Sequence, residues 1–230
     1  MTGTWIAIGL LGAVLVLALA PRPIRRWLWG GHRHKAEAVI VARRDTTSMD
    51  DATGAVRSVQ AADLLLPAPA LEQIWSPEHL ERLARTYWRF LSRVTAGLIH
   101  VRYTANRRYI VLVARPLKLL TFSAPEYEMD PLRGLVRWRI ERGLLVARRG
   151  RHGRGYLQIE VRRRPGGSGP LAQLHVEVEV ANFYPSIASA VSRRIYHVTQ
   201  SRIHVIVTHR FLRSLQRLDL AESKVGRFAR

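Results

Sequence analysis

Hydrophobic positions follow three kinds of pattern along the chain. The first is an uncharged stretch over residues 1–21, of which residues 5–20 are almost wholly apolar. A helix rises about 1.5 Å per residue, so residues 5–20 would cover roughly 24 Å. Their uncharged flanks extend this length toward the roughly 30 Å hydrocarbon core of a bilayer. The pattern predicts one N-terminal transmembrane helix, the anchor, over residues 1–21.

A cleaved signal peptide is the alternative interpretation of this stretch. No Lys or Arg precedes the apolar run, and Pro21 would directly follow the small-residue cleavage site, so a retained anchor is favoured. Basic residues follow the span, which by the positive-inside rule places the C-terminal bulk in the cytoplasm of a single-pass cell-membrane protein. We expect these basic residues to contact anionic lipids; they are Arg22, Arg25, Arg26, Arg33 and Lys35.

Residues 22–70 show no sustained period. Asp50-Asp51, Gly54 and Pro67-Ala68-Pro69 are turn and stop signals, and the apolar runs between them are too brief to fix a strand, except a short one over residues 39–41. We therefore predict a basic juxtamembrane segment and connector over residues 22–70. The folded domain is expected over residues 71–220, followed by a basic tail over residues 221–230.

The second pattern has helical spacing. Ser76 is suited to cap a helix, Pro77 to take its first position and Glu78 to face the positive end of its dipole. One apolar stripe then runs to about Gly97; it comprises Leu80, Leu83, Ala84, Tyr87, Leu91 and Val94.

The third pattern is typical of β-strands: apolar and polar residues mostly alternate with a period of two. It predicts strands over residues 98–104, 109–113, 117–123, 135–141, 144–147, 155–163 and 174–180. Their short connections favour an antiparallel meander, because parallel crossovers need a dozen or more residues. Helical spacing returns from Ser186 to about Leu220. The predicted fold class is α+β: an antiparallel curved sheet packed against a long C-terminal helix, plus the N-terminal transmembrane helix.

This order of elements resembles the helix-grip fold of the START-like ligand-binding superfamily, with the helix over residues 186–218 in the place of that family's closing helix. The family usually opens with a strand, which here only residues 39–41 supply, across a long connector. The resemblance implies a cavity between sheet and C-terminal helix that takes a lipid or another apolar molecule. Candidate pocket residues are aromatic, although such residues more often belong to the plain core: Trp88, Trp138, Tyr156, Phe183 and Tyr184.

Composition and charge limit the classes of partner and of chemistry that suit this chain. The apolar fraction of 47% is enough for a real core, and the absence of cysteine excludes disulfides, thiolate metal sites and a cysteine nucleophile. The net charge of +20 attracts phosphate-bearing surfaces. Between residues 133 and 164, 11 Arg accompany only Glu141 and Glu160. We expect a basic docking face there, made by Arg137, Arg139, Arg148, Arg149, Arg151 and Arg154.

Two partners suit this face: the anionic membrane surface and an acidic membrane-protein partner. Nucleic acid is disfavoured, because no known reading module is recognisable. An Arg-rich composition that places Arg on any exposed face is the third interpretation.

No motif argues for catalysis or for a cofactor. The sequence has no phosphate-binding loop, nucleophile elbow or His-Glu-x-x-His pair. His175, Glu177 and Glu179 share one strand face, and we expect them to pair across strands with Arg137, Arg139 or Arg162 rather than bind a metal. The predicted function is a membrane-anchored, non-enzymatic domain that binds a lipid or other apolar ligand at the cytoplasmic leaflet. The alternative is an accessory or assembly subunit of a larger membrane complex.

Overall fold

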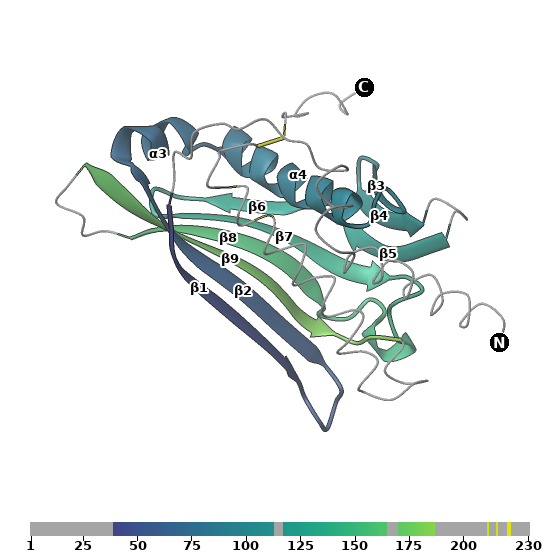
Figure 1. The fold of residues 1–230 in the computed structure, drawn as a ribbon. Helices are drawn as coiled ribbons and strands as arrows, with labels where there is room; N and C mark the ends of the chain where they lie inside the picture. The colour runs from purple at the N-terminus through teal and green to yellow at the C-terminus, as the bar shows by residue number, and fades with distance from the viewer. Residues whose placement is uncertain are drawn as a thin grey trace.

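The computed structural model describes residues 39–112, 117–164 and 170–186, together with Phe211, Leu215, Leu220 and Ala221. In this part of the chain, nine strands form one antiparallel sheet, and two α-helices lie along one of its faces (Figure 1). The fold class is therefore α+β. The elements are β1 (Val39–Met49), β2 (Val56–Pro67), α3 (Ala68–Ile74), α4 (Pro77–Val94), β3 (Ile99–Tyr103), β4 (Arg107–Leu112), β5 (Leu117–Ser123), β6 (Glu126–Met129), β7 (Arg133–Arg142), the 3-10 helix η1 (Arg148–Gly150), β8 (Tyr156–Arg164) and β9 (Leu171–Phe183).

The strand order shows which segments far apart in the sequence lie side by side. The order is β1-β2-β9-β8-β7-β5-β4-β3, so the last strand lies beside the second one. β5 pairs with the second half of β7, and β6 with its first half. Pro125 stands between β5 and β6, where it removes a backbone donor and separates the two strands. The predicted antiparallel, curved sheet is confirmed.

The prediction of a connector before residue 71 is wrong for residues 39–67. These residues form a β1–β2 hairpin, and alternate β2 residues such as Ala62, Leu64 and Leu66 are buried in the core. The alternation is hidden in the sequence because Ser58 and Gln60 occupy inner-face positions of the same strand. Pro67-Ala68-Pro69 is likewise not a stop but the start of α3, which tolerates proline in its first turn.

α4 forms as its sequence predicts. Ser76 is the N-cap, and its Oγ accepts a hydrogen bond from His79 N at 3.3 Å. The helix ends before Gly97, whose φ of +79° is the left-handed conformation that favours glycine. Its apolar stripe packs on the sheet, where Trp88 and Trp138 meet edge to face with ring centroids 5.1 Å apart. The large aromatic side chains therefore fill the centre of the core.

Four predictions fall largely or wholly on residues that the structure does not describe. One is the basic tail over residues 221–230, of which only Ala221 is described. The anchor over residues 1–21 and the basic residues from Arg22 to Lys35 lie outside the described residues. The long helix from residue 186 to about 220 does so too, except for Phe211 and Leu215, which have helical backbone and are buried. No helix within residues 39–112, 117–164 and 170–186 is long and apolar enough to cross a membrane.

Gly143, directly after β7, offers a test of the sheet geometry. Its φ is +149°, and an added Cβ would lie 2.3 Å from the Leu119 carbonyl oxygen. We expect Gly143→Ala to lower the free energy of unfolding by about 1–3 kcal/mol, because backbone cannot yield as a flexible side chain does. Chemical denaturation measures this. Gly153→Ala is the matched control, since its Cβ would meet backbone only at 3.3 Å. Equal losses in both variants would contradict the described close approach.

Candidate functional site

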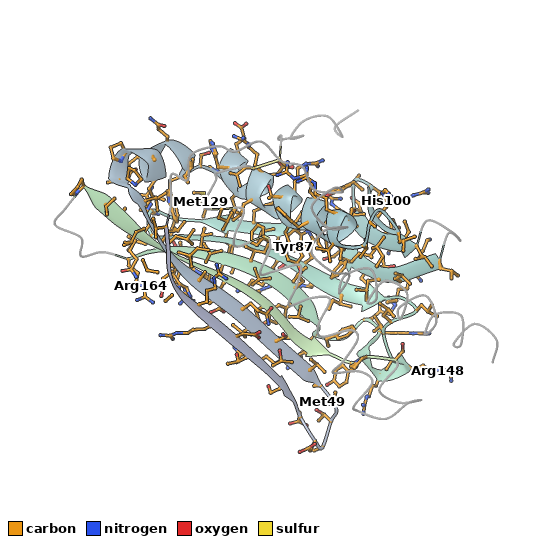
Figure 2. All side chains as sticks on the ribbon, in the orientation of Figure 1. Met49, Tyr87, His100, Met129, Arg148 and Arg164 are labelled. Carbon is orange, nitrogen blue, oxygen red and sulfur yellow. The ribbon has the colours of Figure 1, made fainter. Side chains whose placement is uncertain are left out.

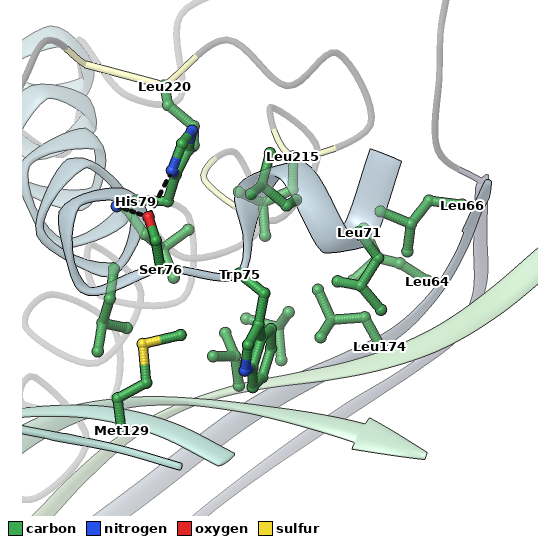
Figure 3. A pocket seen from close by; sticks show the side chains of 15 residues that line it. Leu64, Leu66, Leu71, Trp75, Ser76, His79, Met129, Leu174, Leu215 and Leu220 are labelled. Atoms are coloured by element: carbon green, nitrogen blue, oxygen red, sulfur yellow. Dashed lines mark hydrogen bonds between the residues drawn. The ribbon is translucent and has the colours of Figure 1, made fainter. Parts of the chain in front are cut away.

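An apolar cavity of about 60 Å³ lies where α3 and the start of α4 diverge from the sheet (Figure 3). Its walls come from both helices and from the adjoining parts of β2, β6, β8 and β9. Leu215 and Leu220 complete the lining. Representative wall residues are Leu66, Leu71, Leu80, Leu83, Leu174 and Val176.

Trp75, between the two helices, fixes one wall of the cavity. Its indole Nε1 donates to the Asp130 carbonyl oxygen at 3.1 Å. The guanidinium of Arg163 lies over the ring at 4.3 Å from its centroid and also pairs with Glu72 on α3. The α3–α4 corner is thereby attached to the edge of the sheet.

The cavity has one polar corner, made by Ser76 and His79 (Figure 3). Arg82 Nη1 lies 3.2 Å from His79 Nε2, and an arginine can only donate, so Nε2 accepts. The neutral ring then carries its proton on Nδ1, which donates to Ser76 Oγ at 2.8 Å. Burial, and next the charge of Arg82, lower the pKa of His79 below its ordinary value of 6.5.

Arg82 also connects this corner to the residues that close the cavity. Its Nε donates to the Ala221 carbonyl oxygen at 3.0 Å. The Ala221 N–H donates to Thr86 Oγ1 at 2.7 Å, and that hydroxyl donates to the Arg82 carbonyl oxygen. Ala221 is therefore held on α4 by two hydrogen bonds, directly after Leu220, which lines the cavity.

The cavity volume limits what this arrangement holds. Sites for drug-sized ligands measure about 300–1,000 Å³, and a dry cavity of about 150 Å³ binds benzene. At about 60 Å³, this cavity is smaller than either. Its chemistry suits an apolar group with one hydrogen-bonding atom near Ser76 and His79.

None of the five aromatic residues predicted for a pocket lines this cavity. Trp88, Trp138 and Phe183 are buried in the core. Tyr156 lies on the outer face of the sheet, where its hydroxyl donates to Glu179 at 3.1 Å, and Tyr184 lies half-buried under Arg149. The structure brings only Trp88 and Trp138 into ring contact.

The cavity residues had two signals in the sequence. Leu80 and Leu83 belong to the apolar stripe of α4, which the helical spacing identifies. Leu64, Leu66 and Leu71 lie in an apolar run. The turn and stop signals on either side of this run led to its interpretation as a connector. Nothing in the spacing indicates that these two groups face one another across a void.

The structure divides the predicted basic docking face into two parts. Arg137 donates to Gln158 and lies over the Tyr156 ring, and Arg139 pairs with Glu126 at 2.7 Å. These two side chains are engaged within the sheet. The other four, on the β7–β8 connection, are exposed: Arg148, Arg149, Arg151 and Arg154.

The strand face of His175, Glu177 and Glu179 is paired, but not with the predicted arginines. His175 Nδ1 lies 2.6 Å from Asp63 Oδ1, and Glu179 pairs with Arg57 at 2.7 Å. Both partners come from β2, whose existence the sequence did not reveal. Among the described residues, no group of three or more His, Asp or Glu could hold a metal ion.

Comparison with known proteins places the chain in no family. No family model and no curated protein matches it. Solved structures with some likeness include CalU16 from Micromonospora echinospora, at 12% identity over 77% of this chain and 92% of that one, with a TM-score of 0.31. An uncharacterised protein from Rhizobium leguminosarum matches at 13% identity over 66% and 98%, with a TM-score of 0.27. Human STARD10 matches at 10% identity over 88% of both chains, with a TM-score of 0.23. Scores this low do not establish a shared fold or function.

The Thr86 hydroxyl provides a test of how the cavity is closed. Thr86→Val removes the acceptor of the Ala221 N–H, and we expect about 1 kcal/mol less protection, or roughly fivefold faster hydrogen exchange, in the peptide that contains Leu220 and Ala221. Hydrogen–deuterium exchange with mass spectrometry measures this. Thr95→Val is the control, because Thr95 also bonds back along α4 but contacts Ile99 instead. Unchanged exchange at Ala221 in Thr86→Val would refute the closure.

The polar corner should also respond to pH. Because the pKa of His79 is lowered in the folded protein, the unfolded chain binds the proton first. Stability therefore falls as the pH drops from about 6.5 through the lowered pKa. We expect the free energy of unfolding to depend less on pH, between 7.5 and 5.5, in His79→Gln than in the unaltered chain. Parallel curves for the two proteins would show that His79 does not contribute.

Proposed function

We propose that this chain is a START-like, helix-grip binding domain that holds an apolar or amphipathic molecule between its helices and its sheet, at the cytoplasmic face of the membrane to which the anchor attaches it. The observation that carries the proposal is the cavity, whose lining is apolar except for Ser76 and His79. A nearly uniform apolar wall with one polar corner suits a ligand of the same pattern.

The order of elements supports this assignment. The resemblance requires an opening strand before the helices, and β2 supplies it directly before α3. β9 returns beside β2, so the last described strand pairs with the strand that leads into α3. β1 adds one further strand outside β2.

Ligand binding requires the cavity to enlarge. The side chains that offer least resistance are those at its closing side, Leu215 and Leu220, rather than those on paired strands. Leu220 is only partly buried, and its neighbour Ala221 is held by two hydrogen bonds. We infer that displacement of Leu220 and Ala221 admits the ligand.

A binding role without catalysis also fits the titratable group at the cavity. Both ring nitrogens of His79 are engaged, one with Ser76 and one with Arg82. In this arrangement the imidazole leaves no ring nitrogen free to take a proton from a ligand.

Two neighbouring valines on β9 test the cavity. Val176 and Val178 are both 0% exposed, but only Val176 lines the cavity. We expect Val176→Phe to change the free energy of unfolding by less than about 1 kcal/mol, because the ring extends into empty space, whereas Val178→Phe should cost about 1–3 kcal/mol by overpacking. Chemical denaturation compares them. Equal losses would mean that no usable space exists beside Val176.

The same variant tests ligand binding. Native mass spectrometry of the full chain, gently extracted from its membrane, should reveal a discrete co-purified apolar mass that Val176→Phe lacks. An unaltered chain without such a mass, but with defined non-identical subunits, would contradict the proposal and favour an accessory subunit of a larger complex. The stability comparison separates loss of the ligand from loss of the fold.

A further inference from the structure

The end of β7 and the β7–β8 connection carry four exposed arginines that make neither an ion pair nor a ring contact with a described residue. We name this group the arginine tip: Arg142, Arg148, Arg151 and Arg154. No acidic residue occurs from Arg142 to Gly155, and the preceding Glu141 pairs with Arg107 at 3.1 Å. The positive charge of the tip is therefore not neutralised locally.

Arg149, in the same connection, does not belong to the tip. Its guanidinium lies over the Tyr184 ring, 5.2 Å from the centroid. It also reaches the β1–β2 turn, where a Cβ on Gly54 would be 2.5 Å from Arg149 Nη2. This arginine joins two loops of the molecule, whereas the four tip residues face solvent.

The backbone of the connection is held firmly. Leu145 and Val146 are buried, and Ala147 N donates to the Tyr184 carbonyl oxygen at 2.8 Å. Ser186 N donates to the Leu145 carbonyl oxygen at 3.0 Å, and Ser186 Oγ donates to that of Leu144. The arginines are thus presented from a fixed platform, so little backbone entropy is lost when they bind.

An exposed apolar side chain lies close in sequence to these charges. Leu144 is 39% exposed and lies two residues after Arg142, although its neighbours Leu145 and Val146 point inward. Cations around an exposed leucine match a bilayer interface, where guanidinium groups meet phosphates and the leucine reaches the acyl boundary. An acidic protein partner would neutralise the charge of the arginines, but it would not account for the exposure of Leu144.

We propose that the arginine tip, with Leu144, docks the folded domain on an anionic lipid bilayer. The proposal deepens the membrane placement given under Proposed function and does not depend on what the cavity holds. It also sets an orientation. β7 begins beside the cavity, where Gly134 faces Leu80, and its ten residues run roughly 30 Å to the tip. Figure 2 shows the two ends, marked by Met129 and Arg148. The cavity therefore lies at the opposite end of β7 from the docked surface.

The absence of cysteine from the chain allows a direct test. Leu144→Cys in the full-length protein is labelled with an apolar fluorophore, and the protein is reconstituted with vesicles of brominated phosphatidylcholine, with or without brominated phosphatidylserine. We expect quenching on the phosphatidylserine vesicles only, and its loss in 1 M salt, where the Debye length falls to about 3 Å. A label at the exposed Thr46 on β1 should not be quenched on either kind.

Charge variants identify the arginines responsible. Replacing Arg148, Arg151 and Arg154 with Gln should reduce quenching at position 144 to the level on neutral vesicles, because three residues at about 1 kcal/mol each correspond to roughly 100-fold weaker contact. The matched control removes the same charge from three other exposed arginines without ion pairs among the described residues: Arg43, Arg44 and Arg102. It should leave quenching unchanged.

Three results would overturn the proposal, and a fourth would bear on the anchor alone. Quenching on neutral vesicles, or equal loss in both triple variants, would show that the tip does not recognise anionic lipid. A vesicle-bound chain with no quenching at position 144, but with a fluorescence response to poly-glutamate, would assign the tip to an acidic protein. A chain that stays off neutral vesicles yet is quenched on anionic ones would contradict the anchor and support the tip.

Discussion

The pairing of β2 with β9 is the contact on which the other features depend. It brings the last described strand beside the strand that leads into α3, so strands from both ends of the described chain contribute to the face that the helices cover. On the inner side it aligns Leu64 with Leu174 at the cavity wall; on the outer side it aligns Asp63 with His175. A slip of one residue would exchange these two faces, so one register determines both the cavity and the ion pairs.

Local signals identified most elements, and their failures have physical reasons. Ser76 and Pro77 mark the start of α4 because capping is a property of adjacent residues, and β5 occupies the predicted residues 117–123. β2 escaped detection because polar Ser58 and Gln60 face inward while Leu65 faces outward, which cancels the alternation. Such a strand is specified by its partner β9 rather than by its own pattern.

The candidate site was harder to predict than the fold, because a cavity is a property of how elements diverge. The large aromatics fill the centre, as the contact of Trp88 with Trp138 shows, and the void lies instead at the α3–α4 corner around Trp75. The arginine cluster is visible by counting. Which of its arginines are available to a partner depends on how the strands pair. Arg137 contacts Gln158, and Arg139 contacts Glu126, only in this register.

Closure of the cavity involves contacts of modest strength. Two hydrogen bonds to Ala221 contribute about 1 kcal/mol each, and the partly buried Leu220 about 1 kcal/mol more. An opening cost of about 3 kcal/mol corresponds to an open population of roughly 1%. A ligand that buries more apolar surface than Leu220 gives up would shift this equilibrium toward the open state. Protonation of His79 would shift it the same way, because the charged ring no longer accepts from Arg82, the residue that holds Ala221.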